Sequence, residues 1–83
     1  MRIKTMYYVA YREVGSLKPY HAKMDAQSLG YLLTDWAFVV IEIIKVTTVK
    51  RLFRKPVEIA TKLDPAKERE SIHQMVSTLK EIL

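Results

Sequence analysis

The segment from Phe38 to Thr47 constrains the fold more than any other part of the chain. Six of its residues are both apolar and β-branched, namely Val39, Val40, Ile41, Ile43, Ile44 and Val46. Because successive side chains of a strand point to opposite faces of a sheet, this pattern is apolar on both faces. It predicts a strand that is covered on both sides or lies in the centre of a sheet. Glu42 and Lys45 interrupt the apolar residues, so the segment falls far short of the roughly 20 apolar residues that span a bilayer.

Alternation of apolar and polar residues predicts further strands on either side of this segment. Residues 3–13 alternate throughout, and residues 14–16 supply a turn. Residues 17–24 alternate again, but Pro19 lacks an amide donor, so we expect this strand to be short or to lie at an edge. Residues 57–63 alternate as a short fourth strand would.

Residues 48–55 fit two local structures. They extend the central strand, or Val49, Leu52 and Phe53 form the apolar side of a helical turn. Pro56 ends either structure, because the residue before a proline is displaced from the helical conformation.

Two helices are expected, and each begins at an aspartate. Asp25 is suited to cap the first helix, because its carboxylate can accept a hydrogen bond from a first-turn amide. An apolar stripe follows over about three turns: Leu29, Leu32, Leu33 and Trp36. Asp64 and Pro65 begin the second helix, since proline fits the first helical position and needs no amide partner there. Its apolar face contains Ile72, Met75, Val76, Leu79, Ile82 and Leu83.

We expect this second apolar face to pack on the chain's own sheet. The alternative is a seam against a second copy, but two heptads are short for a coiled coil that forms on its own. A homodimer nevertheless remains open, because a small domain gains stability by burying surface that its own core cannot cover.

These segments together predict a single α+β domain over residues 1–83. The order strand, strand, helix, strand, optional strand and helix gives a small, mostly antiparallel sheet of three to four strands packed against two helices. A chain of 83 residues supports one hydrophobic core, since a domain of this size buries only roughly 60% of its unfolded surface. Its content of 49% apolar and 28% charged residues is typical of a globular protein.

The inventory of reactive residues argues against catalysis. The chain has no cysteine and only two glycines, which leaves no thiolate nucleophile, no Cys-based metal site and no Gly-rich phosphate loop. Glu70 and His73 have the i, i+3 spacing of carboxylate-bridged metal bundles, but such bundles use it twice and the chain has it once. We therefore predict a protein that is not an enzyme, with no catalytic residue, no cofactor and no metal. His21, Glu70 and His73 are interpreted as solvated surface residues.

The expected location is the cytoplasm. A chain without cysteine has no disulfide framework, which favours a reducing compartment. Residues 1–5 alternate between apolar and polar side chains and lack the continuous apolar run of a signal peptide. No association with a membrane is predicted.

A basic segment at residues 45–55 is the one localised functional signal. Its five basic residues account for the whole formal net charge of +5, because the remaining nine basic residues are matched by nine acidic ones. Phe53 is the aromatic residue beside them, and the candidate binding residues are Lys45, Lys50, Arg51, Phe53, Arg54 and Lys55. Three interpretations remain: a docking site for an acidic protein, a nucleic-acid contact that combines phosphate binding with base stacking, or charges that protect a strand end from aggregation.

Two stretches carry a resemblance to known proteins. Residues 4–13 (KTMYYVAYRE) and residues 41–51 (IEIIKVTTVKR) resemble small accessory proteins encoded by phages and prophages of low-GC Gram-positive bacteria. In those proteins a Tyr-rich strand, a helix and a strand ending in Lys-Val-Thr-Thr follow one another. The resemblance covers roughly the first two thirds of the chain. The chain departs from the pattern in its apolar first helix, residues 28–36, and in its helix after Asp64.

The resemblance implies a function but transfers no active-site residue. Proteins of this kind that have an assigned role tend to bind host or defence machinery and to inhibit or redirect it. We therefore expect a small binding protein, encoded by a phage or mobile element, that modulates a host or defence protein. The alternatives are a nucleic-acid-binding accessory protein that uses residues 45–55 and a homo-oligomeric structural subunit.

Overall fold

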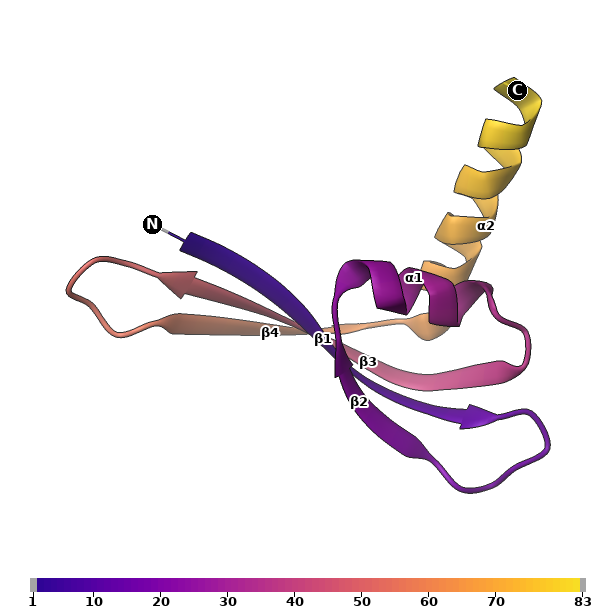
Figure 1. Cartoon of the computed structure of the whole chain (residues 1–83), viewed down its shortest axis with the longest axis horizontal. Helices are drawn as coiled ribbons and strands as arrows, with labels where there is room; N and C mark the ends of the chain where they lie inside the picture. Colours follow the sequence, from indigo (N-terminus) through magenta and orange to yellow (C-terminus); the bar gives the residue numbers. More distant parts are fainter. Residues whose placement is uncertain (1, 83) are drawn as a thin grey trace.

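The β-branched segment forms strand β3 (Phe38–Lys50), one of two central strands in a four-stranded antiparallel sheet. A computed structural model describes the backbone of residues 2–82 and the side chains of residues 2–75 and 77–79. The spatial order of the strands is β2, β1, β3, β4. The remaining elements are β1 (Arg2–Glu13), β2 (Tyr20–Met24), α1 (Ala26–Thr34), β4 (Val57–Leu63) and α2 (Pro65–Ile82). The predicted α+β class and the fourth strand are confirmed (Figure 1).

Both helices pack on the same face of the sheet. Leu29 and Leu33 of α1 meet Val9, Val40 and Ile43 of the central strands in one buried core, and α2 contacts the same cluster. β3 is therefore central, as predicted, but it is covered on one face only. Within residues 2–82, neither helix combines the length and the apolar character needed to cross a bilayer.

A β-bulge in β3 explains how two residues three positions apart both enter the core. Val40 and Ile43 are both buried, whereas strict alternation would place them on opposite faces. Val40 pairs with Tyr11 of β1, but the preceding residue of β1 pairs with Glu42. Ile41 is therefore the additional, unpaired residue. Before the bulge the even-numbered residues of β3 face the helices, and after it the odd-numbered residues do. The segment can supply an apolar core residue on each side of the bulge because its sequence is apolar at both even and odd positions.

Both predicted helix caps are confirmed. The amide of Ser28 donates a hydrogen bond to a carboxylate oxygen of Asp25 at 2.8 Å, and the amide of Ala66 donates to Asp64 at 3.0 Å. Because its ionised form accepts the Ser28 amide, the pKa of the Asp25 carboxyl is lowered from its usual value of 3.8.

The first helix is shorter than predicted, because it ends two residues before Trp36. The carboxylate of Asp35 accepts a hydrogen bond from the Ala37 amide at 2.9 Å, a local turn that competes with continuation of the helix. Trp36 then stacks on His73 of α2 with ring centroids 5.1 Å apart, and the Arg69 guanidinium lies 4.7 Å from the Trp36 centroid. Trp36 thus joins the end of α1 to α2 instead of extending the helical stripe.

Helix α2 is anchored by its first turns only. The Arg69 guanidinium donates to the carbonyl oxygen of Phe38 at 3.1 Å, and Ile72 packs against the core. Farther along, Met75 and Leu79 are 64% and 54% exposed, and the helix projects away from the sheet in Figure 1. The prediction that this apolar face packs on the chain's own sheet is therefore wrong beyond Ile72. Three members of that predicted stripe lie outside the described side chains: Val76, Ile82 and Leu83.

Three strands extend beyond the helices as an arm (Figure 1). We define the arm as residues 2–5 of β1, 46–50 of β3 and 57–60 of β4, with the turn 51–56 at its tip. Of the two structures predicted for residues 48–55, the strand extension is correct as far as Lys50, and a turn follows it. The Cα radius of gyration is 15.3 Å, against about 12 Å for a compact protein of this length.

Candidate functional site

The face of the sheet opposite the helices is uncovered along all four strands, and we call it the open face. Strand alternation assigns its residues, because the core residues Val9 and Ile43 point to the helices. It comprises His21 and Lys23 of β2, Arg2, Lys4, Met6, Tyr8, Ala10 and Arg12 of β1, Val39, Glu42, Ile44, Val46, Thr48 and Lys50 of β3, and Glu58, Ala60 and Lys62 of β4.

Apolar and aromatic side chains occupy the centre of the open face. Tyr8 lies between Lys23 of β2 and Ile44 of β3, and the Lys23 ammonium is 5.8 Å from the Tyr8 ring centroid. In the next row on the same face, Met6 pairs with Val46. These side chains are half-buried or exposed, because both helices pack on the other face of the sheet. The centre of the open face is therefore available apolar surface.

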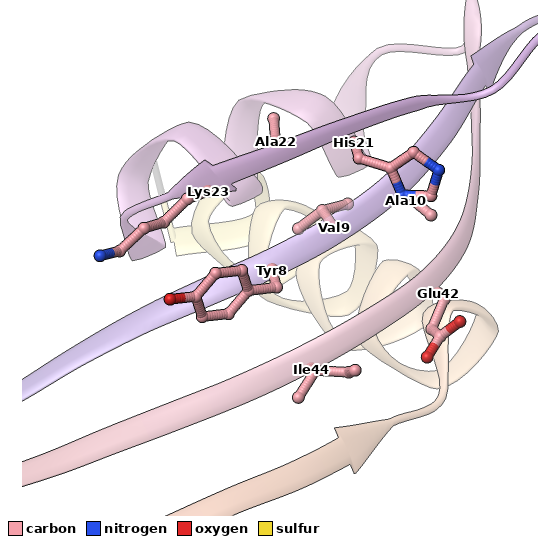
Figure 2. A pocket seen from close by; sticks show the side chains of 8 residues that line it. All are labelled: Tyr8, Val9, Ala10, His21, Ala22, Lys23, Glu42 and Ile44. Atoms are coloured by element: carbon pink, nitrogen blue, oxygen red, sulfur yellow. The ribbon is translucent and has the colours of Figure 1, made fainter. Parts of the chain in front are cut away.

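A shallow depression lies beside Tyr8 (Figure 2). Ala10 separates His21 from Glu42 in one cross-strand row, and its small side chain leaves space between them. The depression has a volume of about 340 Å³. Figure 2 shows both helices behind the strands that bear these side chains. The depression can accept one or two side chains of a partner.

Charge is separated between the open face and the rest of the molecule. The open face and the arm tip together hold nine of the fourteen basic residues but only two of the nine acidic ones, giving a formal charge of +7. The remainder of the chain holds five basic and seven acidic residues, a formal charge of −2. The basic members are Arg2, Lys4, Arg12, Lys23, Lys50, Arg51, Arg54, Lys55 and Lys62.

The arm tip presents Phe53 to solvent. Its side chain is 97% exposed and its backbone φ is +61°, a conformation that few residues other than glycine adopt. The Arg54 amide donates to the carbonyl of Arg51 at 3.3 Å and closes the turn around it. An aromatic ring held outward by a strained turn is not explained by packing within the chain.

The predicted basic segment is brought together only in part. Lys50 ends β3, and Arg51, Phe53, Arg54 and Lys55 share the tip. The remaining predicted residue, Lys45, points to the helix side of the sheet, because it pairs with the core-contacting Tyr7. Five of the six predicted residues therefore share one end of the molecule.

Basic residues on the other strands were missed as candidates. Along the sequence they are balanced by acids, but only two of the nine acids, Glu42 and Glu58, lie on the open face, whereas Lys4, Lys23 and Lys62 all do. The outward position of Lys23 follows from alternation alone. Its place on the same face as the other two follows only from the pairing and order of the strands.

The two residues with metal-bundle spacing do not form a site. Glu70 is exposed, while His73 is half-buried beneath Trp36, so the interpretation of His73 as a solvated residue is wrong. Its Nε2 is buried without a hydrogen-bond partner in the described part of the chain. No three His, Asp or Glu side chains in that part come close enough to hold a metal ion.

Comparison with known proteins gives no functional assignment, because no protein-family model, no curated protein and no solved structure matches the chain.

Proposed function

We propose that this chain is a non-enzymatic protein that binds an acidic surface of another protein through its open face and arm tip. The supporting observation is the separation of charge, with a formal +7 on one uncovered face and tip and −2 elsewhere. Opposite charges across an interface accelerate encounter and select the partner.

The centre of the open face favours a protein over a polyanion as the partner. Protein interfaces combine an apolar centre, often with Tyr or Met, and a polar rim. Tyr8, Met6 and Ile44 supply the centre here, and Lys23 and Lys62 lie in the same row at its edges. Tyr8 is the single aromatic residue on this face, which is fully described. Base stacking along a single strand needs a series of rings.

The resemblance of residues 4–13 and 41–51 to phage and prophage accessory proteins supports a host or defence protein as the partner. We infer that the chain acts in the cytoplasm, where it inhibits or redirects that protein by occupying its surface.

Charge reversal on the open face tests the proposal. Lys23→Glu combined with Lys62→Glu changes two exposed residues in the Tyr8 row. Lys18→Glu combined with Lys67→Glu makes the same change in charge at exposed positions away from the open face. Affinity capture followed by mass spectrometry identifies the partner, and biolayer interferometry with the purified partner compares the variants.

We expect the open-face pair to reduce the association rate and the affinity by at least about tenfold, and the control pair to leave both within about twofold. Equal losses in the two pairs, or none in either, would contradict docking on the open face.

A nucleic-acid-binding accessory role is the second candidate, and the arm tip favours it. Phe53 is fully exposed between Arg51 and Arg54, an arrangement that can stack a base and contact phosphates. Fluorescence anisotropy with a labelled single-stranded oligonucleotide at about 50 mM salt measures this directly, because phosphate contacts are strong at low salt. Binding that weakens steeply with salt and is lost in Phe53→Ala would establish the role. A flat titration would remove it.

A further inference from the structure

The helix side of the molecule contains two apolar surfaces that the chain itself does not cover. The first is the arm patch, defined as the helix-side residues Ile3, Val49, Val57 and Ile59. Ile3, Val49 and Val57 form one cross-strand row, and Ile59 follows on the same face. Ile59 is 55% exposed, although it lies on the same sheet face as the fully buried Ile43. The arm patch therefore continues the core face of the sheet without a helix above it.

The second surface is the outer part of α2. Ile72, Met75 and Leu79 lie on one helical face at spacings of three and four, but only Ile72 reaches the core. Met75 and Leu79 continue that face into solvent. Among the described elements, no helix covers the arm patch, and no strand covers the outer face of α2. Figure 1 shows the arm extending beyond both helices and α2 projecting away from the sheet.

The total exposed area of the chain is larger than that of a compact monomer of its mass. The chain exposes 6696 Å², whereas a folded monomer of 9.7 kDa is expected to expose about 5,100 Å². The excess is roughly 1,600 Å², twice the ~800 Å² that each partner buries in a standard interface. An excess of this size matches what each protomer contributes to an obligate dimer.

We propose that a second copy of this chain covers these surfaces, so that α2 of each copy lies on the arm patch of the other. A two-fold axis relates the two copies, so that the dimer contains two equivalent contacts between α2 and an arm patch and leaves neither surface free for a third copy. Each helix-on-patch contact buries one of the two surfaces from each copy. It thereby enlarges the hydrophobic core of a domain that is too small to bury much apolar surface by itself. The open face lies on the opposite side of the sheet and remains accessible to another protein.

Sedimentation equilibrium over about 5–200 μM protein tests the oligomeric state, with a mass of twice 9.7 kDa expected. Ile59→Glu and Met75→Glu each place a charge on one of the two surfaces. Each should weaken the dimer at least about 30-fold, as expected for the loss of an interface anchor. Leu17→Glu is the matched control, because Leu17 is 94% exposed in the β1–β2 turn and outside both surfaces.

A cysteine experiment tests the pairing of the surfaces without depending on destabilised variants. The natural chain has no cysteine, so Ile59→Cys and Met75→Cys each create a single thiol. After mixing and oxidation, the two chains should form a mixed disulfide dimer in preference to either like pair. Such a bond joins different molecules by construction.

Three results would overturn the proposal: a 9.7 kDa species at all concentrations, dimerisation that Leu17→Glu weakens as much as the other two changes, and failure of the mixed disulfide to form. A monomeric Ile59→Glu variant that still binds an open-face partner would show that the two proposals concern separate surfaces.

Discussion

The covered half of the sheet and the arm are made from the same strands but are stabilised differently. β1 and β3 run through both, with the same alternation of side chains. In the covered half, helix α1 encloses Val9 and Ile43 to 2% and 0% exposure, whereas Ile3 in the arm is 62% exposed. Strand pairing alone therefore extends a sheet well beyond the region where it has a core. The covered half contains the buried core, whereas the chain itself leaves the apolar residues Ile3, Val57 and Ile59 of the arm exposed.

The largest expected effect compares the same substitution in the two halves. Ile43→Ala removes a fully buried side chain and should lower the free energy of unfolding by about 2–5 kcal/mol. That is a large fraction of the ~4–12 kcal/mol expected for a domain of this length. Ile59→Ala, in the arm, should lower it by about 1 kcal/mol or less at low protein concentration. Urea denaturation followed by circular dichroism measures both.

Protein concentration sharpens the same comparison. The cost of Ile59→Ala should rise with concentration if a second copy buries the arm, because association stabilises the folded state by mass action. Concentration should leave the difference between the two variants unchanged if the arm stays exposed.

The next effect concerns the attachment of α2 to the covered half. Trp36→Ala removes the stack on His73 and the cation–π contact with Arg69, with an expected loss of about 1–2 kcal/mol. Hydrogen exchange should show faster exchange in α2 while protection in β1 and β3 is retained. Tyr31→Ala is the control, because Tyr31 is an equally exposed aromatic residue on α1. Uniform loss of protection would show that α2 is part of the main cooperative unit.

A smaller effect is expected at the arm tip. Phe53 has a positive φ, which glycine adopts without strain, so Phe53→Gly should be more stable than Phe53→Ala by about 1 kcal/mol. Both variants should lose partner binding if the exposed ring contributes to it. Equal stability of the two variants would mean that the turn relaxes when the ring is removed.

The smallest effect is the pH dependence from the cap of α1. The folded-state pKa of Asp25 is depressed, so its contribution is fully present above the unfolded value near 3.8 and is lost as pH falls through the lower folded value. Thermal denaturation from neutral pH to below 3.8 should show a steeper acid loss in the natural chain than in Asp25→Asn. Asparagine caps a helix without titrating. Identical pH profiles would exclude this contribution.

Local signals in the sequence predicted the elements well. Alternation identified β1 and β4, and the aspartates identified both helix starts, because each of these signals depends on neighbouring residues only. The end of α1 was missed because the Asp35 carboxylate accepts a hydrogen bond from the Ala37 amide, and this local turn ends the helix before Trp36. The bulge at Ile41 was not predictable, since an apolar β-branched residue fits either phase of the strand.

The candidate surface was only half predictable. The tip residues were found because they are adjacent in the sequence, whereas Lys4, Lys23 and Lys62 come from three strands and share one face only through the order β2, β1, β3, β4. Lys45 lies on the other face of the sheet from Lys50, which could not be read from its adjacency to the basic segment, because adjacency says nothing about the face that a strand residue occupies. The exposure of Met75 and Leu79 in α2 was missed because an amphipathic pattern identifies an apolar helix face but does not show what that face packs against.

The bulge at Ile41 also bears on how this chain can diverge. Deleting that residue would leave plain alternation in the strand, with Val40 still facing the helices and Val39 still facing away from them. The residues of β3 that face the helices are therefore even-numbered before Ile41 and odd-numbered after it. Related chains should keep apolar residues at positions 38 and 40 before that point and at position 43 after it, because these residues face the helices. Position 41 should be the place in this strand where the loss of one residue is best tolerated, because it turns no other side chain to the opposite face.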